Sequence, residues 1–336
     1  MQVEIKDKEK KVVTEAQERK MKGIGLAKTY RELGIGIDGK RFVDKAARLE
    51  SCSTYIQLKK TEDGKCRLHK ANFCHVRLCP VCLSRVSQKV FCQTSRIMDV
   101  IQADYKFLFL TLTIENVPGD QLDEAITQIL ESFDRLAKRQ EFETVIKGWF
   151  RTLEITRNWK SDTWHPHLHM ILVVSADYAK KGHEYLSFEW WRKTWQECVR
   201  SLYVPMVRIE AVKPRKGVDY TGAVSEVTKY VSKISDYFEP PEWLHVSRKR
   251  IQEAVYELDI ALHRRRLVAY GGIMKQIHKR LNFDDPETGD LSNDDGIRSD
   301  LGFVIVTYRW SFANLQYKPD FLLQSETLLQ SEASGE

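Results

Sequence analysis

The sequence of 336 residues predicts an α+β fold, in which a split βαβ antiparallel sheet carries helices on one face. Two observations lead to this prediction. Apolar, β-branched stretches alternate with segments whose apolar residues recur every three or four positions. Their order is strand, helix, strand, strand, helix, strand, which is typical of the split βαβ arrangement. A cysteine-rich stretch before them and a mixed stretch after them predict an N-terminal module and a C-terminal extension of helices and strands.

The elements are justified in chain order. Phe107–Thr113 is apolar and β-branched and ends before the turn at Pro118-Gly119, so it is a predicted strand. Gln121–Lys138 has one apolar helical face. Proline stops a helix at Pro240-Pro241. The other predicted elements are strands at Trp149–Thr156, His165–Val174 and Val204–Val212, helices at Glu184–Leu202, Thr221–Tyr237 and Trp243–Arg266, and a strand at Gly302–Trp310.

The composition restricts the class of protein. No apolar run approaches the roughly 20 residues that span a bilayer, and residues 1–22 are charged where a secretory signal is apolar. We therefore expect a cytoplasmic protein with no membrane partner. The net charge of +6 suits a nucleic-acid partner, although many proteins without one carry such an excess. Four of the seven cysteines fall between Cys66 and Cys82, which in a reducing cytosol indicates metal ligands.

Three histidines alternate in the segment 165–169 (HPHLH), at the head of a predicted strand. Because alternate side chains share one face of a strand, His167 and His169 can bind one cation together. If the two strands form a hairpin centred near residue 161, Glu154 lies opposite positions 167 to 169 and is the favoured third ligand. His165 lies on the same face and stays the alternative. A carboxylate ligand would let magnesium or manganese compete with zinc.

A predicted helix carries the candidate nucleophile. Glu226, Tyr230 and Lys233 lie at i, i+4 and i+7, so they share one helix face. A tyrosine phenol attacks a phosphodiester only where a bound metal and a nearby cation, here Lys233, stabilise the developing negative charge. Attack would give a 5′ phosphotyrosyl DNA and a free 3′ hydroxyl. Glu226 is the candidate general base for a water molecule that releases the strand. Without the histidine strand, this helix would be interpreted as a solvated face with a core tyrosine.

These motifs resemble those of the replication initiators of rolling-circle plasmids from Gram-positive bacteria, within the HUH endonuclease superfamily. The likeness covers residues 20–320 and rests on Phe109–Thr113 (FLTLT), the HPHLH segment and the tyrosine helix, in that order. It implies an HUH-type sheet and a magnesium or manganese ion on His167 and His169. It also implies nicking of the plus strand at a hairpin origin by Tyr230, and termination by Glu226. Origin DNA and a host helicase are the implied partners, and a homodimer is compatible with this reading.

The chain departs from the two-tyrosine branch of that superfamily. Tyr220 and Tyr237 are not one helical turn from Tyr230, so a single nucleophile per chain is expected. Two other functions stay open. One is a conjugative relaxase or a transposase of the same superfamily; transposases are usually shorter, and relaxases usually carry the tyrosine ahead of the histidines. The other is a non-catalytic, zinc-containing DNA-binding repressor, which would form no covalent adduct with DNA.

A second metal site is predicted among the cysteines. Cys79 and Cys82 have the two-residue gap of a zinc knuckle, and Cys74 lies five residues upstream. A hairpin paired about Asp63 would place Cys52 opposite Cys74 and Cys66 near its tip, so Cys52 is preferred to Cys66 and His69 as the fourth ligand. Four thiolates leave no position for substrate, so this Zn²⁺ would be structural. The following Arg85 and Lys89 are candidates for phosphate contacts.

We predict five consecutive segments on these grounds. Residues 1–30 alternate basic and acidic side chains, which is typical of a solvated helix or arm. The segments are a charged helical region (1–45), a zinc-binding hairpin module (46–100), an HUH catalytic domain (101–240), a C-terminal subdomain (241–323) and a disordered tail (324–336).

Overall fold

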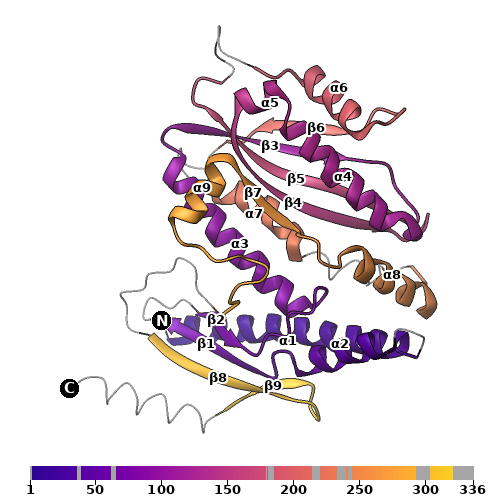
Figure 1. Cartoon of the computed structure of the whole chain (residues 1–336). Helices are drawn as coiled ribbons and strands as arrows, with labels where there is room; N and C mark the ends of the chain where they lie inside the picture. The colour runs from indigo at the N-terminus through magenta and orange to yellow at the C-terminus, as the bar shows by residue number, and fades with distance from the viewer. Residues whose placement is uncertain are drawn as a thin grey trace. The chain divides into compact units, whose positions relative to one another are not determined.

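The computed structural model describes residues 2–35, 39–61, 66–178, 180, 185–213, 220–232, 240, 244–292 and 303–320. These residues form a mixed α+β structure with two antiparallel sheets, so the predicted α+β class is confirmed (Figure 1). The chain divides into two compact units. Unit 1 comprises Met1–Arg85 and Asp290–Glu336, and unit 2 comprises Val86–Gly289. The five predicted segments and their boundaries stay predictions.

Unit 1 contains a four-stranded sheet in the order β2-β1-β8-β9. Its strands and helices are α1 (Gln2–Leu33), α2 (Gly39–Ser51), β1 (Tyr55–Thr61), β2 (Cys66–Ala71), β8 (Phe303–Ser311) and β9 (Gln316–Pro319), together with the first turns of α3 (Pro80–Ile101). Strands β1 and β2 pair from Ile56 with Ala71 to Lys60 with Cys66, so the hairpin is centred at residue 63, as predicted. This register brings the two ends of the hairpin together, next to Cys52 and Cys74.

Helix α1 is not the solvated arm that the charge pattern predicts. Leu26, Ala27 and Tyr30 are fully buried, and the Tyr30 ring stacks on that of Phe42 in α2, with centroids 5.8 Å apart. A few apolar residues at three- and four-residue steps suffice to bury one stripe of a charged helix, because the remaining positions face solvent. The prediction for residues 1–30 is therefore wrong for the inner face of α1.

Unit 2 contains a five-stranded sheet in the order β6-β3-β5-β4-β7, in which every neighbouring pair is antiparallel. Its strands are β3 (Tyr105–Thr113), β4 (Ile146–Asn158), β5 (Thr163–Ser175), β6 (Val207–Ala211) and β7 (Val268–Gly271). Its helices are the rest of α3, η1 (Gly119–Gln121), α4 (Leu122–Ala137), α5 (Gln140–Val145), α6 (Phe188–Val199), α7 (Thr221–Ser232), α8 (Arg248–Ala261) and α9 (Gly272–Arg280). The predicted order from β3 to β6 is observed. The predicted continuation of α7 to Tyr237 lies outside the described residues.

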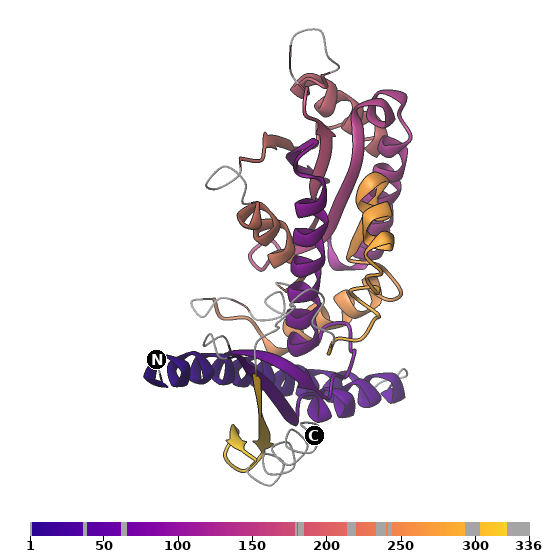
Figure 2. The ribbon, with the colours of Figure 1, turned by 90° about the vertical axis from the view of Figure 1, so that its left-hand side faces the viewer.

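The sheet of unit 2 is covered on both faces. On one face, Trp149 of β4 packs against Phe133 of α4, with ring centroids 4.9 Å apart. On the other face, the Thr152 hydroxyl donates to the Val227 carbonyl of α7 at 3.4 Å. Figure 2 shows α3 and α7 on the side of the sheet opposite α4. The prediction of helices on one face is therefore wrong. The run Met170–Val174 is buried at every position, which fits a strand covered on both sides.

Candidate metal centres

Strands β4 and β5 bring two histidines and a glutamate together. Glu154 pairs with His167 in the sheet register, and His169 follows two residues later on the same face. The Glu154 Oε2 atom lies 2.6 Å from His167 Nε2 and 2.7 Å from His169 Nε2. All three residues are buried, and their ligand atoms lie within 4.8 Å of one another. His165 lies outside this group, with its ring centroid 5.1 Å from that of His167.

The outer nitrogens of both imidazoles have partners that fix the rings. His167 Nδ1 lies 3.0 Å from the His165 carbonyl oxygen, so this nitrogen carries the proton and donates it. His169 Nδ1 lies 3.2 Å from the Thr111 hydroxyl, on the neighbouring strand β3. Such partners orient metal-ligating imidazoles, and a cation would bind in place of the Nε2 protons that face Glu154. The donor set of two imidazoles and one carboxylate thus fits a divalent cation such as Mg²⁺ or Mn²⁺.

The Glu154 carboxyl is ionised at neutral pH. Burial alone would raise its pKa, but the hydrogen bonds with His167 and His169 outweigh burial and lower the pKa to about 2. A carboxylate that stays charged inside the protein is suited to bind a cation. Burial lowers the pKa of the neighbouring His165, which therefore stays neutral at pH 7.

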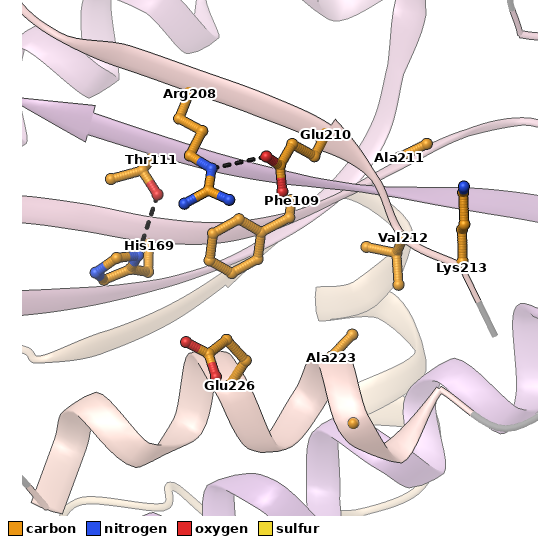
Figure 3. Close-up of a pocket in the computed structure, with 11 residues that line it drawn as sticks. Phe109, Thr111, His169, Arg208, Glu210, Ala211, Val212, Lys213, Ala223 and Glu226 are labelled. Atoms are coloured by element: carbon orange, nitrogen blue, oxygen red, sulfur yellow. Dashed lines mark hydrogen bonds and ion pairs between the residues drawn. The ribbon is translucent and has the colours of Figure 1, made fainter. Parts of the chain in front are cut away.

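A cavity of about 410 Å³ lies beside this cluster, between the sheet and helix α7. Figure 3 shows the Glu226 side chain of α7 directed towards His169 and Phe109 across this cavity. Arg208 of β6 also borders the cavity, and its Nε donates to Glu210 Oε1 at 2.8 Å. The structure thus brings Glu226 to the cavity that His169 lines.

Helix α7 is held over the sheet by its backbone carbonyls. In addition to the bond from Thr152 to Val227, the Ser87 hydroxyl of α3 donates to the Thr228 carbonyl at 2.8 Å. Tyr230 lies in this helix, one turn after Glu226. The side chain of Tyr230 lies outside the described part of the chain, and so does Lys233 as a whole.

Four buried cysteines of unit 1 form the second candidate centre. The Sγ atoms of Cys52 and Cys79 both belong to it and lie 3.6 Å apart, and Cys82 Sγ lies 3.8 Å from both Cys52 Sγ and Cys74 Sγ. Zinc–sulfur bonds of 2.3 Å in a tetrahedron require an edge of about 3.8 Å between sulfurs, so the group fits Zn²⁺. Cys66 pairs with Lys60 in the β1–β2 hairpin and lies outside this group, as does His69.

Sequence reasoning missed one residue beside the cysteines. The Lys20 side chain of α1 is 1% exposed, and its ammonium donates to the carbonyls of Glu50 at 2.6 Å and Cys52 at 2.5 Å. Burial lowers the pKa of this ammonium, while negative charge on the cysteine sulfurs opposes that shift. The position of Lys20 in the sequence could have indicated its burial. It lies one helical turn after Ala16, on the apolar stripe of α1 that also carries Ala27.

The prediction that Arg85 and Lys89 contact phosphate is wrong. Both residues are about 4% exposed. Arg85 Nε donates to the Leu291 carbonyl at 2.5 Å, and Lys89 Nζ forms an ion pair with Asp284 at 2.6 Å. These two basic side chains of α3 therefore have partners within the protein. Among the described helices, none has the length and apolar character to cross a membrane.

The fold and the two centres define the class as an α+β protein whose buried side chains can hold metal ions at two places. The family model for a replication protein matches residues 65–318. The chain belongs to this family of replication proteins. The resemblance to plasmid initiators of Gram-positive bacteria, drawn from the motifs, is thereby confirmed, whereas the HUH assignment stays a prediction.

Individual relatives agree with the family match. The chain is 36% identical over 305 residues to the protein rep of Streptococcus pneumoniae serotype 2, covering 89% of this chain and 90% of that protein. It is 37% identical over 280 residues to the protein rep of Bacillus amyloliquefaciens, covering 79% and 81%. It is 29% identical over 311 residues to the protein rep of Lentilactobacillus hilgardii, covering 90% and 93%. No solved structure matches the chain.

Proposed function

We propose that this replication protein initiates plasmid replication as an HUH-type nickase, in which Tyr230 attacks a phosphodiester of the origin plus strand. One observation carries the proposal. Helix α7, which contains Tyr230, lies over the sheet face on which Glu154, His167 and His169 converge. Glu226 borders the cavity beside His169, and Tyr230 follows Glu226 by one helical turn in the sequence of α7.

The chemistry of nicking is a transesterification. The phenol of Tyr230 loses its proton and its oxygen forms a bond to phosphorus, the bond from phosphorus to the 3′ oxygen breaks, and that oxygen takes up one proton, so no net proton is released. A magnesium or manganese ion on His167, His169 and Glu154 would neutralise the non-bridging oxygens when bound. Lys233 would stabilise the phenolate. The resulting phosphotyrosine conserves the bond energy, so a 3′ hydroxyl can later rejoin the strand without ATP.

Release at termination needs a base. We assign this role to Glu226, whose carboxylate would accept a proton from a water molecule that attacks the phosphotyrosine. Its position at the cavity beside His169 supports the assignment.

The four cysteines would hold a structural Zn²⁺, since the spacing of their sulfurs suits a closed tetrahedral site. The proposed partners are plasmid origin DNA and a host helicase in the cytoplasm. Light scattering tests whether the active form is a homodimer.

The test is a covalent adduct with DNA. The protein is incubated with manganese and a single-stranded oligonucleotide that carries the origin hairpin of its own replicon, labelled at the 3′ end, and separated on a denaturing gel. We expect a slowly migrating labelled band for the wild type and for Tyr256→Phe, an exposed tyrosine of α8, but none for Tyr230→Phe. An oligonucleotide labelled at the 5′ end should give only a shortened strand. A wild type that forms no adduct would leave the non-catalytic repressor as the better interpretation.

A further inference from the structure

A second polar cavity lies at the opposite end of the histidine row. It has a volume of about 460 Å³ and is lined by residues at the β4–β5 turn, together with Asn116 and Leu244. His165 and Thr156, which pair across the two strands, form its boundary towards the metal centre. Lys160 lies at the turn and is exposed. This cavity has the size of a small-ligand site and offers a cation, an imidazole and amide and hydroxyl groups.

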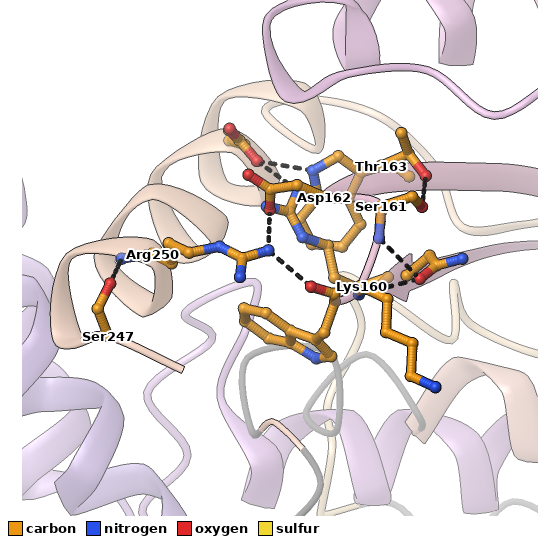
Figure 4. Close-up of polar contacts among 11 residues, drawn as sticks. Lys160, Ser161, Asp162, Thr163, Ser247 and Arg250 are labelled. Carbon is orange, nitrogen blue, oxygen red and sulfur yellow. Dashed lines mark hydrogen bonds and ion pairs between the residues drawn. The ribbon is translucent and has the colours of Figure 1, made fainter. Parts of the chain in front are cut away.

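The turn beside this cavity is rigidly built. The Arg157 guanidinium lies over the Trp164 ring, 4.5 Å from its centroid, and pairs with Asp162 and with Glu257 of α8. Arg250 of α8 donates to the Trp159 carbonyl at 2.7 Å. Figure 4 shows this network and the Lys160 side chain extending away from it. These contacts with α8 hold the turn in place, and the Lys160 side chain extends away from them.

The metal centre lies between the two cavities: the first extends from β5 over β3 and β6 towards α7, and the second lies at the β4–β5 turn. His165 borders the turn cavity, His167 belongs to the metal centre, and His169 borders both the metal centre and the cavity with Phe109 and Arg208. All three histidines are on one face because they alternate along the strand, and the outer two are about 13 Å apart. An extended nucleotide chain laid along β5 would therefore place successive phosphates at the three positions.

We propose that the DNA strand passes over the three histidines of β5 and continues over β3 and β6, with the nucleotide on one side of the scissile phosphate at His165 and Lys160, and that on the other side at Phe109 and Arg208. The inference rests on the proposed nicking function. His165 then contacts DNA and is not a metal ligand. Lys160 and Arg208 supply charge for flanking phosphates, and the half-buried Phe109 ring offers a surface on which a base can stack.

The first test measures binding without cleavage. A short fluorescein-labelled oligothymidylate is titrated with protein in chelator, and its anisotropy is followed at several salt concentrations. We expect Lys160→Ala and Arg208→Ala each to weaken binding about fivefold and to reduce the salt slope by about 0.7. The matched control is Lys147→Ala, an exposed lysine at the far end of β4, which should bind like the wild type. If both variants bind with the wild-type affinity and slope, the proposal is overturned.

The second test separates DNA contact from metal binding at His165. His165→Ala should weaken oligothymidylate binding yet keep the wild-type manganese affinity, measured by electron paramagnetic resonance, whereas His167→Ala should lose manganese. A manganese affinity that falls equally in both variants would make His165 a ligand and overturn its assignment to DNA. Photocrosslinking with 5-iodouridine in the oligonucleotide should label peptides containing Phe109 and peptides from the 157–165 turn. Labelling of neither peptide would also overturn the proposal.

These outcomes are independent of the nicking reaction. Protein that crosslinks at both cavities but forms no adduct in manganese would refute nicking and retain the binding path. Protein that forms the adduct, but binds DNA equally well without Lys160, His165 or Arg208, would refute the path and retain nicking.

Discussion

Replacement of Lys20 by methionine should destabilise unit 1. Methionine has a similar length and is accommodated without a large cavity, so the main loss is the ammonium. The carbonyls of Glu50 and Cys52, bonded to it at 2.6 and 2.5 Å, would lose their donor. At about 1.5 kcal/mol for each buried carbonyl, the loss is about 3 kcal/mol. The variant no longer has to bury a charged ammonium, and this gain offsets part of the loss. We therefore expect the free energy of unfolding to decrease by about 2 kcal/mol.

The measurement is urea denaturation of the zinc-loaded protein, followed by circular dichroism. Lys28 is exposed on the same helix, so Lys28→Met is the matched control and should change the free energy of unfolding by less than about 0.5 kcal/mol. A Lys20→Met variant as stable as the wild type, or more stable, would refute the reasoning. That result would mean that the cost of burying the ammonium equals or exceeds the benefit of its hydrogen bonds.

Three other outcomes are expected. Asp284→Ala leaves the Lys89 ammonium, whose side chain is 1% exposed, without its carboxylate partner, and should cost about 3 kcal/mol in urea denaturation. Cys52→Ser should lower the zinc content and the melting temperature, whereas Cys66→Ser should retain zinc by elemental analysis, since Cys66 lies outside the cysteine group. Without metal, the stabilisation that Glu154 gains from its lowered pKa is fully present above pH 4.5 and is lost as the pH falls towards about 2. The unfolding free energy of Glu154→Gln should therefore fall less steeply over that interval, and parallel curves would contradict this account.

Local patterns were enough to predict the succession of elements from β3 to β6 and two hairpin registers, but they did not predict β7 or α9. Continuous apolar, β-branched runs identified β3 and β5, and a repeat of three to four residues identified α4. A hairpin centre near residue 161 predicted Glu154 opposite His167, and this pairing is observed. The role of these side chains as metal ligands stays a prediction.

The remaining features depend on partners distant in the sequence. Strand β8 pairs with β1 across more than 240 residues, and nothing in either segment specifies the other. The burial of Arg85 and Lys89 depends on Leu291 and Asp284, which lie 206 and 195 residues away in the sequence. A basic residue with a buried acceptor looks the same in sequence as one that faces solvent. Tertiary contacts thus decide which basic side chains face solvent.

The division of unit 1 between the two ends of the chain has a consequence for biosynthesis. The ribosome completes all of unit 2 before residues 303–311 emerge to cover the edge of β1. Until then, the hairpin of β1 and β2 exposes unpaired backbone groups along one side, which is a hazard for aggregation. A messenger RNA truncated after codon 290 would therefore yield a polypeptide in which the sheet of unit 2 is complete, whereas β1 keeps an unpaired edge that can associate with other chains.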